Sequence, residues 1–464
     1  MKVPPGPRGR AAYGFLGGRG GAGTIEFLNK TARNYGAISS FRIFGKRIYL
    51  IDDAELIREI LVTRQHEFVR DTGANLLREL VGDGLITREE PQHKERRRVL
   101  QPAFHRDQIA SYVQIMAGEV EEFSAKWTNG GIVDIRREMR RLTLSIVGAS
   151  LFGSDLRESA DAVADVLGGV ARKSVFLAPA ITFFEPLVLT YRRYFPRGPS
   201  LFFRKERSAL ERIIDPIIQA GRAHPRSAAG KGILDLILSG MADEEKPLTD
   251  EEVRNELVTF VLAGHETTAT ALTWTWYLLG RHPHVADQTQ AEVDSVLSSG
   301  PLDLGAISRL KYTSQVFDEA LRLYPPALAF ARRPKQRLQL GGYEIPRGAS
   351  IFLSPYVTQR NERYFERPES FEPERWKNPI WPKFAYFPFG GGAKMCIGEP
   401  FARIEGVIAL AILTREWRLS SADSFDAAAS GTMLLQPDRA INMRLVSRGS
   451  VDSIRGYDTA TVRR

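Results

Sequence analysis

The sequence contains a single cysteine, Cys396, among 464 residues. One thiol cannot form a disulfide within the chain, so the fold needs no oxidising compartment and we expect a cytoplasmic protein. The N-terminus also lacks an apolar stretch of signal-peptide or anchor length, because three prolines stand there among basic residues. The longest apolar run, 257–279, includes a histidine and a glutamate, which predicts a buried helix rather than a membrane span. We therefore expect no membrane anchor.

Low-complexity tracts and long Gly, Ser or Pro linkers are also missing. We predict one domain over residues 1–448, followed by a polar tail over 449–464. The chain has 64 basic and 55 acidic residues, a net charge of +9 that favours an acidic partner. No basic patch is interleaved with aromatic residues, so we expect no nucleic-acid partner. We expect a monomer.

The spacing of apolar residues predicts the fold class. Segment 54–325 is dominated by helical periodicity. Segments 37–53 and 335–448 contain short strand-like alternations, turns and prolines, with one further helix over 397–414. The expected fold is mostly α with a small β part.

Cys396 lies in a glycine-rich loop, 389–398, that reads FGGGAKMCIG and leads into the helix over 397–414. Glycines let a backbone pass close to a flat ligand, and the free amides of a helix N-terminus stabilise a thiolate. Such a thiolate is a suitable soft ligand for haem iron. A lone cysteine beside a turn is more often a small buried thiol. Here the surrounding loop favours a ligand.

Glu319 and Arg322 share one face of a predicted helix upstream of this loop. As an isolated surface pair they would contribute about 0.2–0.5 kcal/mol to stability. However, the segment LYPP follows at 323–326, and Arg375 stands within FEPERW, 21 residues before the cysteine. These flanking motifs weigh against an isolated surface pair.

The long apolar segment contains the hexapeptide AGHETT at 263–268. The small pair Ala263 and Gly264 would let a helix approach a flat group. The residues alone leave two interpretations equally open. In one, this turn of the helix binds a ligand; in the other, it is an ordinary helix interior in which the threonine hydroxyl bonds back to a backbone carbonyl and the glutamate has no functional role. We expect His265 to be a core histidine with its hydrogen bonds satisfied.

Together these motifs resemble the cytochrome P450 family of haem-thiolate monooxygenases, and they follow the family's order over nearly the whole chain. The glycine-rich loop matches the family's cysteine signature at Phe389, Gly392, Cys396 and Gly398. It departs from the signature at Lys394, where the family usually has an Arg or His that contacts a haem propionate. Lysine keeps the charge but loses the bidentate fork of arginine.

The resemblance implies a role for each motif. Thr267 and Glu266 would be catalytic, supporting dioxygen activation and relaying protons, beside a distorted helical turn that leaves a groove for dioxygen. The residues that match the family's buried structural triad are Glu319, Arg322 and Arg375. The implied residues around haem b are the metal ligand Cys396 together with His93, Arg97, Arg332, Lys394, Phe389, Gly398, Ala263 and Gly264. Arg332 is preferred over Arg333 because it lies ten residues before Gly342, which is the family's spacing.

The resemblance also implies a triangular helical prism and the insertion of one oxygen atom from dioxygen, by hydroxylation or epoxidation. We expect a small hydrophobic substrate such as a terpenoid, steroid, fatty acid or polyketide. Electrons would come from a separate ferredoxin with its reductase or from a flavodoxin-type donor. Two rivals stay open, a peroxide-using haem-thiolate enzyme and a non-catalytic haem sensor. The implied pocket walls are 69–85, 174–184, 261–263, 327–330 and 432–434.

Overall fold

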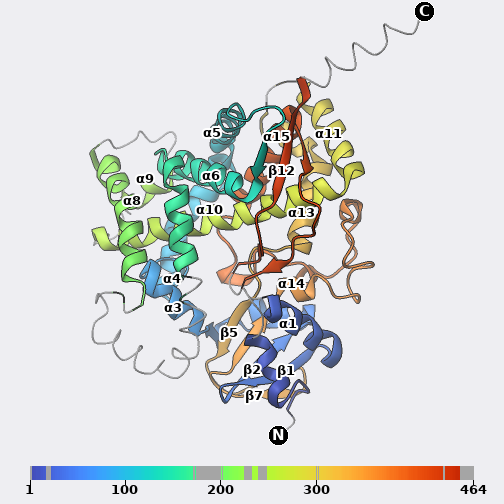
Figure 1. Ribbon diagram of the computed structural model, residues 1–464. Coiled ribbons are helices and arrows are strands. Elements are labelled where there is room, and N and C mark those ends of the chain that lie inside the picture. Colours follow the sequence, from blue (N-terminus) through green and yellow to red (C-terminus); the bar gives the residue numbers. More distant parts are fainter. Residues whose placement is uncertain are drawn as a thin grey trace, which may run out of the picture.

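The computed structural model describes residues 3–16, 22–170, 173, 200, 202–223, 232–238, 248–298, 300, 302–431 and 434–449. Helices dominate these ranges, which confirms the predicted fold class (Figure 1). The α-helices are α1 (Ala22–Tyr35), α2 (Ala54–Arg58), α3 (Thr72–Val81), α4 (Gln92–Leu100), α5 (Arg106–Ser124), α6 (Ile135–Val147), α8 (Arg204–Ala223), α9 (Ile233–Leu238), α10 (Asp250–Arg281), α11 (Pro283–Leu297), α12 (Leu304–Arg309), α13 (Lys311–Leu323), α14 (Pro355–Thr358) and α15 (Glu399–Glu416).

Helix α10 runs through the middle of the helical part and packs against α6, α8, α13 and α15 (Figure 1). It begins at a capping box, in which the Thr249 side chain accepts from the Glu252 amide and the Glu252 side chain accepts from the Thr249 amide. It ends at Arg281, just before Pro283, which starts α11. The helix is apolar nearly all round because other helices surround it.

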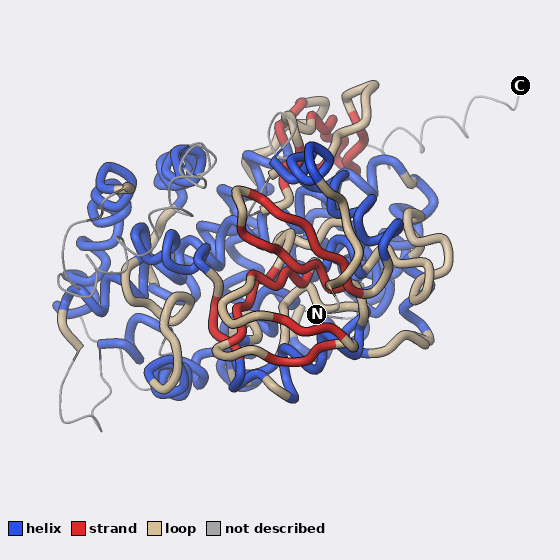
Figure 2. Tube along the Cα trace, turned by 90° about the horizontal axis from the view of Figure 1, so that it is seen from below, coloured by secondary structure: helices blue, strands red, loops and turns tan. Residues whose placement is uncertain are grey.

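Short strands form four small sheets. The strands are β1 (Ile38–Ile43), β2 (Lys46–Ile51), β3 (Phe68–Arg70), β4 (Ile132–Asp134), β5 (Phe330–Pro334), β6 (Leu338–Leu340), β7 (Tyr343–Ile345), β8 (Ser350–Leu353), β9 (Trp417–Ser421), β10 (Ala429–Ser430), β11 (Gln436–Pro437) and β12 (Asn442–Ser447). The largest sheet has the order β1-β2-β8-β5-β3, and the next has the order β4-β12-β9. Figure 2 shows one group of strands near the middle of the view and a second at its upper edge, with helices on both sides.

Strand β2 is apolar on both faces because both faces of the largest sheet are covered. Tyr49 and Ile51 belong to one buried cluster with residues of β6, β7 and β8, whereas Ile48 and Leu50 belong to another with α1. This two-sided burial accompanies the parallel pairing of β2 with β8. None of the described helices is long and apolar enough to cross a membrane.

Candidate active site

The cysteine loop is folded by its own backbone hydrogen bonds. The amide of Cys396 donates to the Phe389 carbonyl (3.0 Å), and the amide of Met395 donates to the Gly392 carbonyl (3.1 Å). Helix α15 starts directly afterwards, with Gly398 at its N-cap and Pro400 in its first turn. The loop therefore delivers Cys396 to a helix N-terminus, as the sequence predicts.

Gly392 is required by a close approach to the five-residue π-helical turn Glu59–Thr63. Its φ is +70°, and a Cβ added there would lie 1.7 Å from the Leu61 carbonyl oxygen. The Gln65 side chain also accepts from the Ala393 amide (2.7 Å). These contacts hold the loop against the N-terminal part of the chain.

The Cys396 thiol faces an interior opening. The residue is exposed, yet burial raises the pKa of its thiol, so the sulfur lies deep in the protein beside open space. The backbone amides of Gly398 and Glu399 hydrogen-bond the sulfur and oppose this rise in pKa. A soft ligand with helix-terminal amides behind it suits a thiolate bound to iron.

One face of α10 is also partly exposed within an otherwise buried helix. Leu262, Ala263, Gly264 and Thr267 are partly exposed, whereas their neighbours along the helix are buried. A Cβ added at Gly264 would meet only Val147 within 4 Å. These residues fit a flat group that approaches the helix at its small side chains.

Phe104 connects this helix to the cysteine loop. Its ring stacks on Phe260 of α10 at a centroid distance of 6.0 Å. The same ring lies 3.8 Å from the position of a Cβ added at Gly398. The partly exposed face of α10 and the open thiol therefore belong to one region of the molecule, and the residues there fit a haem with a thiolate ligand.

The structure records α10 as one α-helix from Asp250 to Arg281, without a break at the expected distorted turn beside Thr267. The Thr267 hydroxyl donates to the Ala263 carbonyl, four residues back, at 2.6 Å. This back-bond satisfies the hydroxyl donor inside an apolar helix. The oxygen of Thr267 keeps its lone pairs as acceptors.

Glu266 is buried, and both oxygens of its carboxylate accept hydrogen bonds. Nε of Arg140 donates to both carboxylate oxygens (3.0 and 2.9 Å), and a second guanidinium nitrogen pairs with Oε1. Gln436 also donates to Oε1 (2.5 Å), and Arg136 in turn hydrogen-bonds Gln436. Because the Arg140 side chain is 18% exposed and Glu266 1% exposed, Arg140 stands between the acid and solvent.

His265 is buried, as expected, but neither ring nitrogen makes a well-aligned hydrogen bond among the described residues. Burial lowers the pKa of His265 to about 4, so the ring is neutral near pH 7. A backbone group of Arg140 opposes this shift by raising the pKa of the ring. A neutral ring can be enclosed by apolar neighbours at a smaller free-energy cost than a charged one.

The basic residues assigned to propionates lie near the cysteine loop. Arg97 donates to the Met395 carbonyl (2.5 Å), and its charge acts on Cys396. His93 is buried, with Nδ1 3.1 Å from Glu90, and burial lowers its pKa. Arg332 is buried, and burial followed by repulsion from Arg70 lowers its pKa to about 10.

Lys394 has an acidic partner among the described residues. Its ammonium is ion-paired with the Glu89 carboxylate. Glu89 lies on the segment before α4, and the loop lysine can reach it because both elements border the same region. The choice of Arg332 over Arg333 has support, since Arg333 lies 3.3 Å from the Asp71 carboxylate.

The predicted triad residues are in contact. Glu319 Oε1 accepts from Arg322 (2.9 Å) and from Arg375 (2.9 Å), and both Glu319 and Arg322 are fully buried. Trp376 donates to the second carboxylate oxygen (2.9 Å). Each charge of the triad therefore has a charged partner, which a buried ion needs.

Gln359, which no sequence motif marks, connects the triad helix to the cysteine loop. Its amide nitrogen donates to the Arg322 carbonyl (2.9 Å), and its amide oxygen accepts from the Phe387 amide (3.0 Å). Phe387 in turn accepts from the Gly390 amide (2.9 Å). Arg140, Gln436 and Glu89 were not predicted either, because none of them stands in a local motif.

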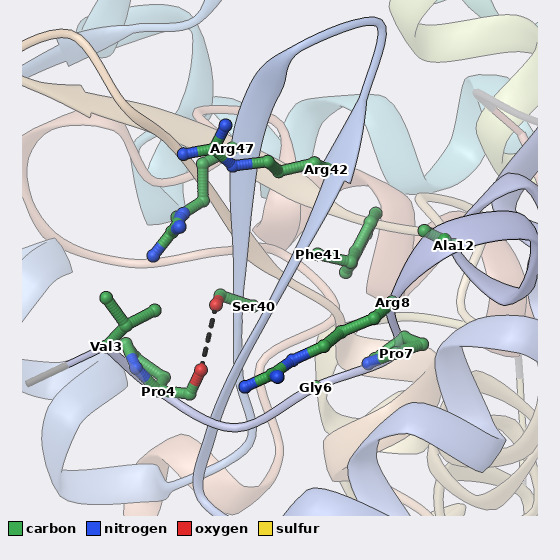
Figure 3. A pocket seen from close by; sticks show the side chains of 11 residues that line it. Val3, Pro4, Gly6, Pro7, Arg8, Ala12, Ser40, Phe41, Arg42 and Arg47 are labelled. Carbon is green, nitrogen blue, oxygen red and sulfur yellow. Dashed lines mark hydrogen bonds between the residues drawn. The ribbon is translucent and has the colours of Figure 1, made fainter.

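Of the implied pocket walls, 174–184 and residues 432–433 lie outside the described residues. A surface pocket of about 330 Å³ lies elsewhere, between the N-terminal segment and the β1–β2 hairpin (Figure 3). Ser40 donates to the Pro4 carbonyl there (3.0 Å), and Arg8, Arg42 and Arg47 line the pocket. It includes none of the candidate site residues.

Comparisons with known proteins agree with this site. The profile of the family described as Cytochrome P450 matches residues 4–443. Cyclooctatin synthase of Streptomyces melanosporofaciens is 34% identical over 397 residues, covering 83% of each chain. Pentalenene oxygenase of Streptomyces avermitilis is 28% identical over 435 residues, covering 91% of this chain and 93% of that one.

Among solved structures, the crystal structure of the cytochrome P450DA heme domain superposes with a TM-score of 0.82 at 27% identity. The match covers 96% of this chain and 98% of that one. Named monooxygenases are among the curated relatives, including cyclooctat-9-en-7-ol 5-monooxygenase of Streptomyces melanosporofaciens at 31% identity over 83% of each chain. The chain therefore belongs to the cytochrome P450 family, whose cofactor is a haem with a thiolate ligand, and it is a monooxygenase.

Proposed function

We propose that this monooxygenase binds haem b through Cys396 and hydroxylates or epoxidises an apolar, terpenoid-like molecule. The observation that carries the proposal is the pairing of two open surfaces inside the protein. One is the thiol of the chain's single cysteine, and the other is the stripe of α10 formed by Ala263, Gly264 and Thr267.

Bound between these surfaces, the haem-thiolate group would supply the reduction of dioxygen and the transfer of one oxygen atom to the substrate, with the other leaving as water. Cys396 would hold the iron, with the amides of Gly398 and Glu399 stabilising its negative charge. His93, Arg97 and Arg332 would hold the propionates. Phe389 supports the loop, since its ring lies beneath the Arg403 guanidinium at 5.0 Å.

Thr267 and Glu266 would take part in proton transfer to dioxygen. Because the Thr267 hydroxyl donates to the Ala263 carbonyl, its oxygen can accept a hydrogen bond from a donor in the open space. Glu266 would exchange protons on the other side of the helix. Its carboxylate must first loosen from Arg140, whose side chain is partly exposed, so we assign Arg140 the role of a positioning residue.

The apolar side chains of the implied pocket walls support an apolar substrate. Leu76 and Leu77 of α3 and Leu262 of α10 are partly exposed beside the largest buried cluster, and Phe330 begins β5. The relatives named for cyclooctatin, cyclooctat-9-en-7-ol and pentalenene support a terpenoid in particular. A rigid hydrocarbon would gain free energy from leaving water at about 25 cal/mol per Å² of buried apolar surface.

Electrons would come from a separate carrier. The net charge of +9 favours an acidic protein, a ferredoxin with its reductase or a flavodoxin. We further propose that the protein acts as a monomer in the cytoplasm, where a lone thiol stays reduced.

The first test is the carbon monoxide difference spectrum of the dithionite-reduced protein beside a Cys396→Ser variant. A long-wavelength Soret band in the parent, absent from the variant, is expected. Folded parent protein supplied with haem but lacking the band would contradict the proposal.

The second test is turnover with a surrogate ferredoxin and reductase, using a cyclic terpene alcohol as the candidate substrate. We expect a Soret shift on binding and an oxygenated product that depends on reduced carrier. Product formed only with added peroxide would favour the peroxide-using rival. A full absence of product under both conditions would favour a sensor.

A further inference from the structure

A single glutamine stands between the buried acid Glu266 and a second arginine of α6. Gln436 of β11 donates from its amide nitrogen to Oε1 of Glu266 (2.5 Å), and its amide oxygen accepts from the Arg136 guanidinium. Helices α6 and α10 carry the arginine and the acid, and they pack against each other (Figure 1). The neutral amide of Gln436 therefore separates the charge of Arg136 from that of Glu266.

Arg136 differs from its neighbours on α6 in having no ion pair of its own. Arg137 and Arg141 both pair with the Asp161 carboxylate. Among the described residues, no carboxylate lies within ion-pairing distance of the Arg136 guanidinium, which donates to Gln436 instead. Burial, followed by repulsion from Arg140, lowers the pKa of Arg136, while the charge of Glu266 opposes this shift. Without Gln436, this partly buried cation would be attracted to Glu266.

A second guanidinium would change what Glu266 can do. Arg140 already donates to both of its carboxylate oxygens. Opposite charges next to a carboxylate favour its ionised form, so a further arginine would make it harder for the acid to take up a proton. The amide of Gln436 donates a neutral hydrogen bond, which is weaker than one from a guanidinium. It satisfies the buried oxygen without adding a charge.

The backbone beside Gln436 is held by contacts that do not involve Glu266. The Leu435 amide donates to the Pro326 carbonyl (2.8 Å), and the Leu435 carbonyl accepts from Nε1 of Trp274 (2.7 Å). The Gln436 amide donates to the Leu434 carbonyl (3.1 Å). A substitution at Gln436 can therefore remove the side-chain amide while this part of the chain stays in place.

We propose that Gln436 is a positioning residue that keeps Arg136 away from Glu266 and so leaves the acid able to exchange protons. The proposal rests on the proposed proton transfer by Glu266, and it adds a residue that stands in none of the motifs of the site. It has a specific consequence. Loss of the glutamine should impair turnover only while Arg136 is present.

The test is a double-mutant cycle on turnover with the surrogate ferredoxin, its reductase and a cyclic terpene alcohol. Gln436→Met keeps the length of the side chain but has no amide. We expect its product formation to fall roughly 10-fold, as one added hydrogen bond to a charged group implies. The solvent deuterium isotope effect should rise, while the substrate-induced Soret shift stays unchanged. Adding Arg136→Met should bring product formation back to within about threefold of the parent, and Arg136→Met alone should also stay within about threefold.

A crystal structure of the Gln436→Met holoenzyme gives a readout that does not depend on turnover. We expect the Arg136 guanidinium to move to within about 4 Å of the Glu266 carboxylate, the distance of an ion pair. Gln339→Met, at an exposed position of β6, is the matched control. It should match the parent in product formation, in the isotope effect and in the position of Arg136.

Several results would overturn this role of Gln436. One is a double variant as slow as Gln436→Met, since a general disturbance of the fold would then explain the loss. Others are a slow Arg136→Met variant, or an Arg136 side chain turned to solvent in the Gln436→Met structure. Parent-like turnover by Gln436→Met beside an impaired Glu266→Gln would overturn the role of the glutamine alone. Parent-like turnover by Glu266→Gln would overturn the role of the acid and that of Gln436 together.

Discussion

At the scale of single residues, the contacts of Glu266 determine how its carboxylate can act. The acid is buried and held by a bidentate arginine and a glutamine, so it is not simply open to water. Breaking such a pair by removing one charge leaves the other uncompensated. Arg140 is the partner that can turn toward solvent, because its side chain is partly exposed.

Glu266→Gln should therefore separate proton delivery from binding. The amide has the size of the acid and can still be hydrogen-bonded, but it cannot exchange a proton. We expect the rate of product formation to fall roughly 100-fold, the low end for general acid–base catalysis, while the substrate-induced Soret shift is unchanged. Glu251→Gln, near the start of the same helix, is the control. Parent-like turnover by Glu266→Gln would assign proton delivery to another group.

The site could be predicted from sequence where its residues stand in local motifs. Cys396, Thr267 and Glu319 lie within a few residues of their defining neighbours, so spacing alone singles them out. Arg140 and Gln436 reach Glu266 from positions 126 and 170 residues away. No local pattern marks such partners, because tertiary packing brings them together.

At the scale of elements, the segment before α4 is docked on α10 by a buried acid. Glu256 accepts from the Leu85 amide (2.9 Å) and lies 3.2 Å from the Arg96 guanidinium. Cβ atoms added at Gly82 and Gly84 would collide with Asn255 and Thr259 of the same helix. Glu256 thus positions a wall of the proposed substrate pocket.

This contact predicts a pH dependence of stability. Burial raises the pKa of Glu256 to about 7, from 4.5 in an exposed chain. Between these values the folded protein holds a proton that the unfolded chain has lost, so this group makes stability fall as pH rises through about 7. Glutamine keeps the acceptor for Leu85 but does not titrate.

We therefore expect Glu256→Gln to gain roughly 2–3 kcal/mol relative to the parent between pH 5 and pH 8, measured from urea unfolding midpoints. Glu251→Gln should show no such trend. A stability difference that stays constant across this pH range would mean that Glu256 does not titrate there.

The docking of the cysteine loop gives a second prediction at this scale. Gly392→Ala places a Cβ against the Leu61 carbonyl and forces a left-handed residue, so we expect the carbon monoxide band per mole of folded protein to fall severalfold. Gly348→Ala is a matched control, since its φ is +73° and nothing lies within 4 Å of the added Cβ. Its strain alone costs about 1–2 kcal/mol. Equal losses in the two variants would show that strain, not the contact with Leu61, decides the effect.

The elements themselves were predicted better than their pairing. Helical periodicity over 107–127, 201–220 and 250–279 predicts three helices, and the bounds of α5, α8 and α10 lie within three residues of these ranges. The same periodicity over 139–152 predicts a single helix, whereas the structure has α6 followed by a π-helical turn, Gly148–Phe152. A wider turn of this kind cannot be predicted from the spacing of apolar residues. The order of the five-stranded sheet depends on contacts between distant segments, which no local pattern contains.

At the scale of the whole molecule, the excess of positive charge bears on electron delivery. A charge of +9 raises the rate of encounter with an acidic carrier, and salt screens that attraction. We expect the first-electron rate with an acidic ferredoxin to fall severalfold between 50 and 300 mM salt, while substrate binding by the Soret shift changes little. A salt-independent rate would indicate a docking contact governed by apolar surface.

The parallel pairing of β2 with β8 also bears on how the chain matures. The two strands are about 300 residues apart, and a ribosome adds roughly 5–20 residues each second, so β2 waits roughly 15–60 s for its partner. During that interval the hairpin of β1 and β2 has an unpaired apolar edge, which invites pairing with other nascent chains. Slower synthesis after β2 would lengthen this exposure, and the yield of folded protein would then depend on chaperones that cover the hairpin until β8 emerges.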